Sequence, residues 1–136
     1  MDNFRNAAKA FIVRDNKLFM LKRRPNDPHK PGKLDIPGGR LELGEDPYSG
    51  LNREVKEEIN SEVEIIMPID VQHFVREDGQ KITLTMYWCK LTLDHIGLSE
   101  EHTEYKWMDL EKDLHEIPPF FTKAISNFKK HIKSNE

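Results

Sequence analysis

The stretch that decides the fold runs from Gly39 to Ser61 and reads GRLELGEDPYSGLNREVKEEINS. Asp46 is a suitable N-cap, and Pro47 suits the first helical turn because its missing amide hydrogen would have no helical partner there. Asn60 tolerates the left-handed conformation that often ends a helix. Between these ends, apolar residues recur three and four positions apart, at Tyr48, Leu51, Val55 and Ile59. The sequence therefore predicts an amphipathic helix over residues 47–59.

Three glutamates share one side of this helix. At about 100° per residue, Glu54, Glu57 and Glu58 fall within about 100° of arc, and like charges at such spacing repel by a few tenths of a kcal/mol per pair. A hard divalent cation would neutralise them, and Mg²⁺ is the usual ion where carboxylates meet phosphates. The alternative is an ordinary solvated face balanced by Arg53 and other basic residues. Gly50 lies on the same side, where a missing side chain leaves room for a ligand or a neighbouring backbone.

The residues before the helix favour the metal-binding alternative. Together with the helix they resemble the Nudix box, whose pattern is G-x5-E-x7-R-E-U-x-E-E-x-G-U, with U a bulky aliphatic residue. The positions that match are Gly39, Glu45, Arg53, Glu54, Val55, Glu57 and Glu58. Asn60 stands where the box has its closing glycine, and Ser61 stands at its last aliphatic position. Because asparagine tolerates the left-handed conformation, the turn is expected to survive this departure.

The resemblance implies a role for each matching residue. The implied ligands of one or more Mg²⁺ or Mn²⁺ ions are the carboxylates of Glu54, Glu57 and Glu58, the backbone carbonyl of Gly38 and, from a facing loop, Glu101. Arg53 and Glu45 are expected to form a pair that orients the catalytic helix. The implied reaction is hydrolysis of a diphosphate linkage in a nucleoside diphosphate joined to another group. The general base is left open between a helix carboxylate, Glu101 and His102.

Substrate binding would require cations and aromatic rings. Arg23, Arg24 and Arg40 are the candidate phosphate ligands, although each also fits plain surface charge. Because strand side chains alternate between faces, only one of Arg23 and Arg24 is expected to point inward. His29 and Lys30 could form part of a lid. The aromatic residues that could stack on a base, or belong to the core, are Phe4, Phe74, Tyr87 and Phe121.

The rest of the chain predicts one α/β domain over residues 1–136. Strands are expected over 7–13, 18–24, 63–67, 69–75, 81–93 and 105–108, with a hairpin turn at Asp15-Asn16, a loop over 25–32, a turn over 37–39 and a break at Pro68. A closing amphipathic helix is expected to bury Phe120, Phe121, Ala124, Ile125, Phe128 and Ile132. The resemblance implies an α/β/α sandwich, with a mixed sheet between the catalytic helix and this C-terminal helix.

Composition excludes several classes of partner. The 136 residues carry 21 basic and 24 acidic side chains, a formal charge of -3, which gives no electrostatic basis for nucleic-acid binding. The sequence has no apolar run long enough to span a bilayer, and residues 1–9 are too polar for a signal peptide. The lone Cys89 is typical of an intracellular protein, so we expect a cytoplasmic location. The expected partner is a small nucleotide, and the protein could be a monomer or a homodimer.

The favoured function is a metal-dependent pyrophosphohydrolase, with nucleoside triphosphates slightly preferred as substrates. One alternative is a non-catalytic Nudix-fold module that senses a nucleotide, and another is an ADP-ribose or nucleotide-sugar hydrolase. Relatives that cleave ADP-ribose often have a proline where this chain has Arg76. Small 8-oxo-dGTP hydrolases can have an asparagine after a Pro-Pro pair, whereas Phe120 follows Pro118-Pro119 here. An isopentenyl-type diphosphate isomerase would need a catalytic cysteine, and Cys89 lies inside an expected strand.

Overall fold

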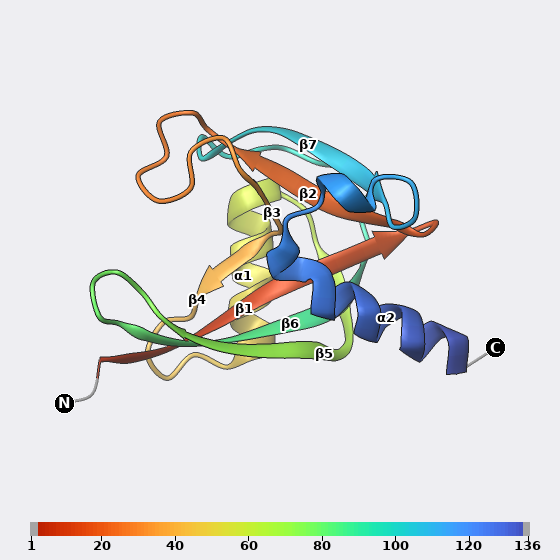
Figure 1. Ribbon diagram of the computed structural model, residues 1–136. Coiled ribbons are helices and arrows are strands. Elements are labelled where there is room, and N and C mark those ends of the chain that lie inside the picture. The colour runs from red at the N-terminus through yellow and green to blue at the C-terminus, as the bar shows by residue number, and fades with distance from the viewer. Residues whose placement is uncertain (1–2, 135–136) are drawn as a thin grey trace.

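Seven strands form one mixed sheet that separates two helices in the computed structural model, which describes residues 3–134 (Figure 1). In chain order the strands are β1 (Phe4–Arg14), β2 (Lys17–Arg23), β3 (Leu34–Asp35), β4 (Gly38–Arg40), β5 (Val63–Val75), β6 (Lys81–Leu91) and β7 (His102–Asp109). The helices are α1 (Pro47–Ile59) and α2 (Thr122–Ser134), and two 3-10 turns, η1 (Leu114–Glu116) and η2 (Pro119–Phe121), precede α2. The expected α/β/α sandwich is confirmed.

Strand β1 organises the sheet, whose order is β3-β2-β1-β6-β5, with β4 paired to β1 and β7 paired to β2. Only the β1–β6 pair is parallel within the described chain. The first half of β1 lies between β6 and β4, and its end turns into β2 through Asp15 and Asn16. Both turn residues have positive φ, 52° and 59°, as a two-residue hairpin of the favoured twist requires. The expected hairpin is confirmed.

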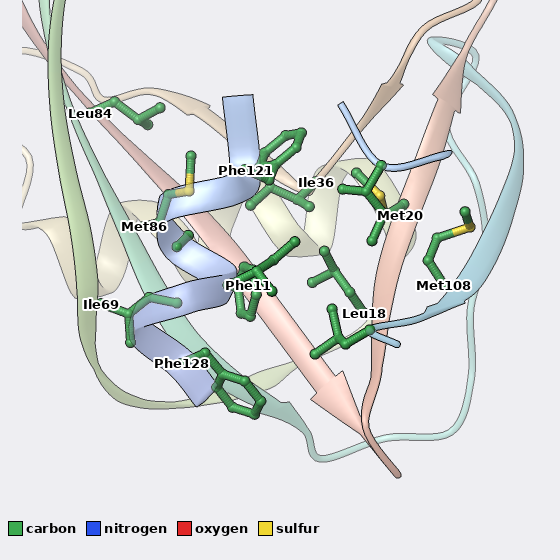
Figure 2. Packing of buried hydrophobic residues seen from close by; sticks show 14 of the residues in the cluster. Phe11, Leu18, Met20, Ile36, Ile69, Leu84, Met86, Met108, Phe121 and Phe128 are labelled. Atoms are coloured by element: carbon green, nitrogen blue, oxygen red, sulfur yellow. The ribbon is translucent and has the colours of Figure 1, made fainter. Parts of the chain in front are cut away.

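Two apolar clusters fill the spaces on either side of the sheet. Alternation along β1 sends Ala7 and Phe11 towards α2, and Ala10 and Ile12 towards α1. Figure 2 shows the larger cluster, in which Phe11 of β1 lies beside α2 and Phe128 extends from that helix. From α2 and η2 it receives Phe121, Ala124, Ile125 and Phe128, as expected. Ile132 departs from the expectation, since it is 37% exposed.

Helix α1 has the bounds that local signals predict. The carboxylate of Asp46 accepts hydrogen bonds from the backbone amides of Tyr48 and Ser49, and Asn60 ends the helix at φ 48°, ψ 44°. Leu51, Val55 and Ile59 are fully buried, but Tyr48 is 53% exposed. Its ring packs 5.6 Å from that of Tyr87 instead of entering the core.

The two residues at which the box departs from its pattern are accommodated in the structure. The Asn60 side-chain nitrogen lies 3.1 Å from Nε2 of His95. Ser61 is buried, and its hydroxyl donates to the carbonyl of Leu93 at 3.3 Å. A serine is therefore tolerated at an apolar position because its polar atom is satisfied.

Two expectations about strands are wrong. Pro68 does not break the chain into two strands, because β5 runs from Val63 to Val75 with register shifts on both sides of the proline. In an edge strand a proline need not remove a hydrogen bond of the sheet, because the position of its missing amide hydrogen can face solvent. A bulge accommodates the fixed φ angle of the proline. Residues 37–39 are not merely a turn, since Gly38–Arg40 pair with β1. Only glycine fits at position 38, where φ is +129° and a Cβ atom would lie 2.2 Å from the carbonyl of Ala8.

Within residues 3–134 no helix is both long and apolar enough to cross a membrane.

Candidate active site

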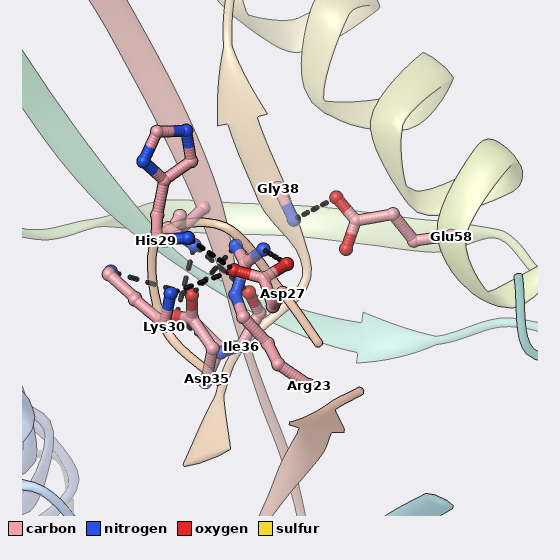
Figure 3. Close-up of polar contacts among 9 residues, drawn as sticks. Arg23, Asp27, His29, Lys30, Asp35, Ile36, Gly38 and Glu58 are labelled. Atoms are coloured by element: carbon pink, nitrogen blue, oxygen red, sulfur yellow. Dashed lines mark hydrogen bonds and ion pairs between the residues drawn. The ribbon is translucent and has the colours of Figure 1, made fainter. Parts of the chain in front are cut away.

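The last turns of α1 lie against the glycine backbone of β4. Glu58 is only 8% exposed, and its Oε1 accepts a hydrogen bond from the Gly38 amide at 3.3 Å (Figure 3). The Glu54 carboxylate faces Gly39, at which a Cβ atom would lie 3.4–3.5 Å from the three carboxylate atoms. The backbone of β4 therefore lies next to two carboxylates of the helix. Three predicted site residues, Gly38, Glu54 and Glu58, are brought together in this way.

Burial dominates the electrostatics of these carboxylates. It raises the pKa of Glu58 to about 8, against the opposing charge of Lys9 and with a contribution from neighbouring Glu54. Burial also raises the pKa of Glu54 above its ordinary value, although Arg53 lies nearby. Two adjacent, desolvated carboxylates favour protons or a cation over an empty, fully ionised pair. Oxygen donors of this kind suit a hard divalent cation, so the residues present fit the metal that the resemblance implies.

Arg53 is the centre of an ion-pair network on the outer side of these carboxylates. Its Nε and Nη2 atoms donate to the two oxygens of Glu45, each at 2.8 Å, which is the bidentate geometry of a strong pair. Nη1 donates to both oxygens of Glu57 at 3.2 Å and lies 3.4 Å from Glu54. The hydrogen bond from Arg53 lowers the pKa of Glu45 to about 2. The structure thus contains the expected pair; its role in orienting α1 stays a prediction.

Gly50 is explained by this network. A Cβ atom at position 50 would lie 2.5 Å from Cδ2 of Leu41 and 2.9 Å from Cδ of Glu45. The space is therefore filled by two side chains of this protein, and the expected room for a ligand or a backbone is not found there.

The complete ligand set is not assembled. No three His, Cys, Asp or Glu side chains of residues 3–134 form a group that could hold a metal ion. Glu57 is held by Arg53, and its side chain is 58% exposed. Glu101 is also exposed, but its loop packs on the end of α1, where the Ser99 amide donates to the Glu58 carbonyl at 3.0 Å. The metal roles of Glu57 and Glu101 therefore stay predictions.

His102 is a poor candidate for the general base. It is 6% exposed, and burial lowers its pKa below the ordinary value. Its Nδ1 atom is buried without a hydrogen-bond partner among the described residues. A base must reach the water that it deprotonates, and this imidazole is enclosed at the start of β7.

The three candidate arginines differ in what their side chains already bind. Arg23 points inward and is paired with Asp27 at 3.3 Å and Asp35 at 3.2 Å, which leaves it little capacity for a phosphate. Arg40 donates to the Gln80 side chain in the β5–β6 turn at 2.8 Å. Arg24 is half-buried and, unlike Arg23, makes no ion pair within the described structure, although the Nε atoms of both arginines lack a partner there. Arg24 is therefore the strongest of the three candidates for a phosphate ligand.

A cavity of about 350 Å³ opens between the proline-rich loop and η2. Its walls include Lys30, Lys33, Leu34 and the segment 118–121. The Lys30 ammonium lies over the Phe120 ring, 5.6 Å from its centre, on the wall of the cavity. Of the aromatic candidates only Phe121 lines it. Phe4 stacks on His73, Phe74 contacts Phe120 from β5, and Tyr87 packs beside Tyr48.

Three residues at the site were missed in the sequence. Lys9 and Asp35 form a buried ion pair at 3.0 Å. Phe120 was expected on the apolar face of the C-terminal helix, whereas it lies in η2, before that helix begins. Lys9 is the one charged residue inside the apolar run over 7–13, which was a usable signal. Its partner could not be identified because Asp35 lies 26 residues away.

Comparison with known proteins assigns the chain to a protein family. The NUDIX domain model matches residues 3–128. An 8-oxo-dGTP diphosphatase of Escherichia coli (strain K12) is 36% identical over 67 residues, which are 49% of this chain and 46% of the relative. A MutT-like protein of Streptomyces ambofaciens is 28% identical over 103 residues, 76% of this chain and 62% of the relative. The matched segments thus span less than two thirds of either curated relative.

A solved structure agrees with the fold over nearly the whole chain. The crystal structure of the MutT protein from Methanosarcina mazei Go1 has a TM-score of 0.81 and 26% sequence identity, and the alignment covers 97% of both chains. The family match extends from β1 into α2 and therefore includes the carboxylates, the two glycines and the Arg53–Glu45 pair. This chain belongs to the NUDIX domain family.

Proposed function

We propose that the protein is a metal-dependent pyrophosphohydrolase that cleaves a diphosphate linkage in nucleoside diphosphate derivatives, with nucleoside triphosphates as its preferred substrates. The observation that carries the proposal is the pair of buried carboxylates, Glu54 and Glu58, held against the glycines of β4. Adjacent carboxylates whose pKa values are raised by burial are typical of catalytic sites. The name of the Escherichia coli relative, an 8-oxo-dGTP diphosphatase, supports the same reaction class.

The carboxylates of Glu54 and Glu58, with the Gly38 carbonyl, would hold Mg²⁺ or Mn²⁺, and Glu57 and Glu101 would complete the set. When bound, the ion supplies charge neutralisation of the phosphate oxygens and a water of lowered pKa. The chain itself supplies the positions of these groups. The Gly38 amide fixes one oxygen of Glu58, and Arg53 ties α1 to Glu45.

Proton transfer and phosphate binding are assigned to residues near this pair. The base must reach the attacking water, which favours the exposed Glu101 over the enclosed His102. Arg24 would bind a substrate phosphate through its uncommitted guanidinium.

The cavity beside the proline-rich loop is the proposed place for the nucleoside. Lys30 and Lys33 offer donors to the carbonyl oxygens of a base, and the base would stack on Phe120 by displacing the Lys30 ammonium from its ring. The absence of an asparagine at position 120 leaves the identity of the base open to experiment. The lone Cys89 is fully buried, with its pKa raised to about 12 by burial, which supports an enzyme without a catalytic cysteine.

The test is a substrate panel with Mg²⁺, with and without EDTA. It contains nucleoside triphosphates, oxidised nucleotides, nucleotide sugars, ADP-ribose and dinucleoside polyphosphates, and released phosphate or pyrophosphate is measured. We expect metal-dependent release from the triphosphates, and loss of turnover by orders of magnitude in Glu58→Gln. Tight nucleotide binding without release from any compound would contradict the proposal and support the sensor alternative.

A further inference from the structure

A buried ion cluster lies on the other side of β4 from Glu58 (Figure 3). Its centre is Asp35, which is 2% exposed. Three cations surround this carboxylate, Lys9 at 3.0 Å, Arg23 at 3.2 Å and Lys30 at 3.7 Å. Although burial opposes ionisation, the charges of Lys9 and Lys30 hold the pKa of Asp35 well below its ordinary value.

The cluster also fixes the proline-rich loop. Arg23 pairs with Asp27, whose other oxygen accepts the backbone amides of His29 at 3.0 Å and Lys30 at 2.7 Å. The same set of contacts therefore joins the loop wall of the cavity to the start of β4.

Lys9 makes one contact that the rest of the cluster does not. Besides Asp35, its ammonium donates to the backbone carbonyl of Ile36 at 3.3 Å. The next carbonyl, that of Pro37, accepts from the Ala10 amide at 2.7 Å. Two successive carbonyls are thus tied to β1 immediately before Gly38.

Gly38 itself rests on Lys9. A Cβ atom at position 38 would lie 2.6 Å from Cα and 3.0 Å from Cγ of Lys9. Lys9, together with the backbone of Ala8, therefore packs directly against the residue whose amide hydrogen bonds to Glu58. Because a buried ion pair recovers little more than its desolvation cost, stability alone does not account for a charged residue at this place in β1.

We propose that Lys9 is a positioning residue, whose hydrogen bonds to Asp35 and to the Ile36 carbonyl hold Gly38 in the place where it aligns Glu58. Lys9 acts through the backbone of residues 36–38 and does not itself contact the substrate. The effect on turnover rests on the proposed function, whereas the effect on Gly38 does not.

The experiment compares two substitutions that break the same ion pair. Lys9→Met keeps the length of the side chain but loses both hydrogen bonds. Asp35→Asn loses the charge of the pair but leaves Lys9 bonded to Ile36 and keeps an oxygen that accepts the Ile36 amide. Hydrogen exchange of the Gly38 amide is measured by NMR in the metal-free proteins, relative to the amide of Leu84 in the core of β6, which corrects for a change in global stability.

In Lys9→Met we expect exchange of the Gly38 amide, relative to that of Leu84, to become at least tenfold faster, which is the size expected for losing about one hydrogen bond. In Asp35→Asn the same ratio should stay within threefold of the wild-type value. With the best substrate of the wild-type protein, kcat of Lys9→Met should fall at least tenfold while KM changes less than twofold. Equal exchange in the two variants, or unchanged exchange in Lys9→Met, would make the pair merely structural and overturn the proposal.

Two safeguards keep the result decisive. If Lys9→Met does not fold, the double variant Lys9→Met/Asp35→Asn also removes the buried carboxylate that has lost one of its three cations, and it is compared with Asp35→Asn in the same way. If the wild-type protein hydrolyses no nucleotide, the proposed function fails, but the exchange of Gly38 still decides whether Lys9 positions it.

Discussion

Replacing Glu58 by glutamine should stabilise the metal-free protein at neutral pH. In the unfolded chain this carboxyl ionises near its ordinary pKa of 4.5, whereas burial raises the pKa to about 8 in the folded protein. The folded state therefore disfavours the charged form wherever the unfolded chain carries it. Glutamine never ionises and keeps an oxygen for the Gly38 amide, so the penalty disappears while the hydrogen bond remains.

The magnitude follows from linkage. Because the pKa of Glu58 is higher in the folded protein, this residue does not lower the free energy of unfolding below pH 4.5. Between pH 4.5 and about 8 the free energy of unfolding falls progressively as pH rises. At about 1.4 kcal/mol per pH unit, the cost is roughly 1 kcal/mol at pH 5 and about 3 kcal/mol at pH 7, and it levels off near 5 kcal/mol above pH 8. The free energy of unfolding of Glu58→Gln should therefore exceed that of wild type by an amount that grows with pH in this way.

Urea unfolding at pH 5, 7 and 8.5 in EDTA measures this difference. Asp35 and His102 also have shifted pKa values, but both are present in the two proteins. Glu54 interacts directly with Glu58, so the relief of their repulsion is part of the measured difference. Glu57→Gln is the matched control, because the Glu57 side chain is 58% exposed. This substitution should change the free energy of unfolding by no more than about 0.5 kcal/mol. A Glu58→Gln protein less stable than wild type at pH 7, or a difference that does not grow with pH, would refute the reasoning.

Three further substitutions test other parts of the structure. Gly50→Ala should lower the free energy of unfolding by about 1–3 kcal/mol, despite alanine's better helix propensity, because its Cβ would collide with Leu41; urea unfolding that shows a gain would contradict this. Arg53→Lys keeps the charge but loses the bidentate contact with Glu45, so kcat should fall by about tenfold with little change in melting temperature, and an unchanged kcat would remove the pair from the mechanism. Phe120→Ala should raise KM for the nucleotide at least fivefold at unchanged kcat, because about 1–3 kcal/mol of stacking is lost; equal KM values would place the base elsewhere.

Local signals were sufficient for the catalytic helix. Asp46, Pro47 and Asn60 specify its ends through interactions within a few residues, and the helical repeat brings Glu54 and Glu58 together. The Arg53–Glu45 pair followed from a motif whose spacing spans only eight residues. These features need no knowledge of the sheet.

The remaining features depend on pairings that sequence patterns do not encode. Pro68 lies within a strand because its register against β6 shifts there, and Gly38 is in a strand because β1 passes beside it. Lys9 meets Asp35 across 26 residues, and Arg40 meets Gln80 across 40. A charged residue in a strand is ordinarily assigned to the solvent face, so the buried ion pair could only be found in three dimensions.

The bulged course of β5 has a consequence for solubility. β5 forms an open edge of the sheet and exposes Val71 and Val75, at 58% and 61%, a combination that invites pairing with a strand from another molecule. Pro68 offers no amide hydrogen, and the register shifts beside it disturb the spacing of the remaining donors. An incoming strand could therefore extend only along residues 70–75, where the register is regular, and not past Pro68, so the irregularity that hid this strand in the sequence also shortens the edge that another molecule could use.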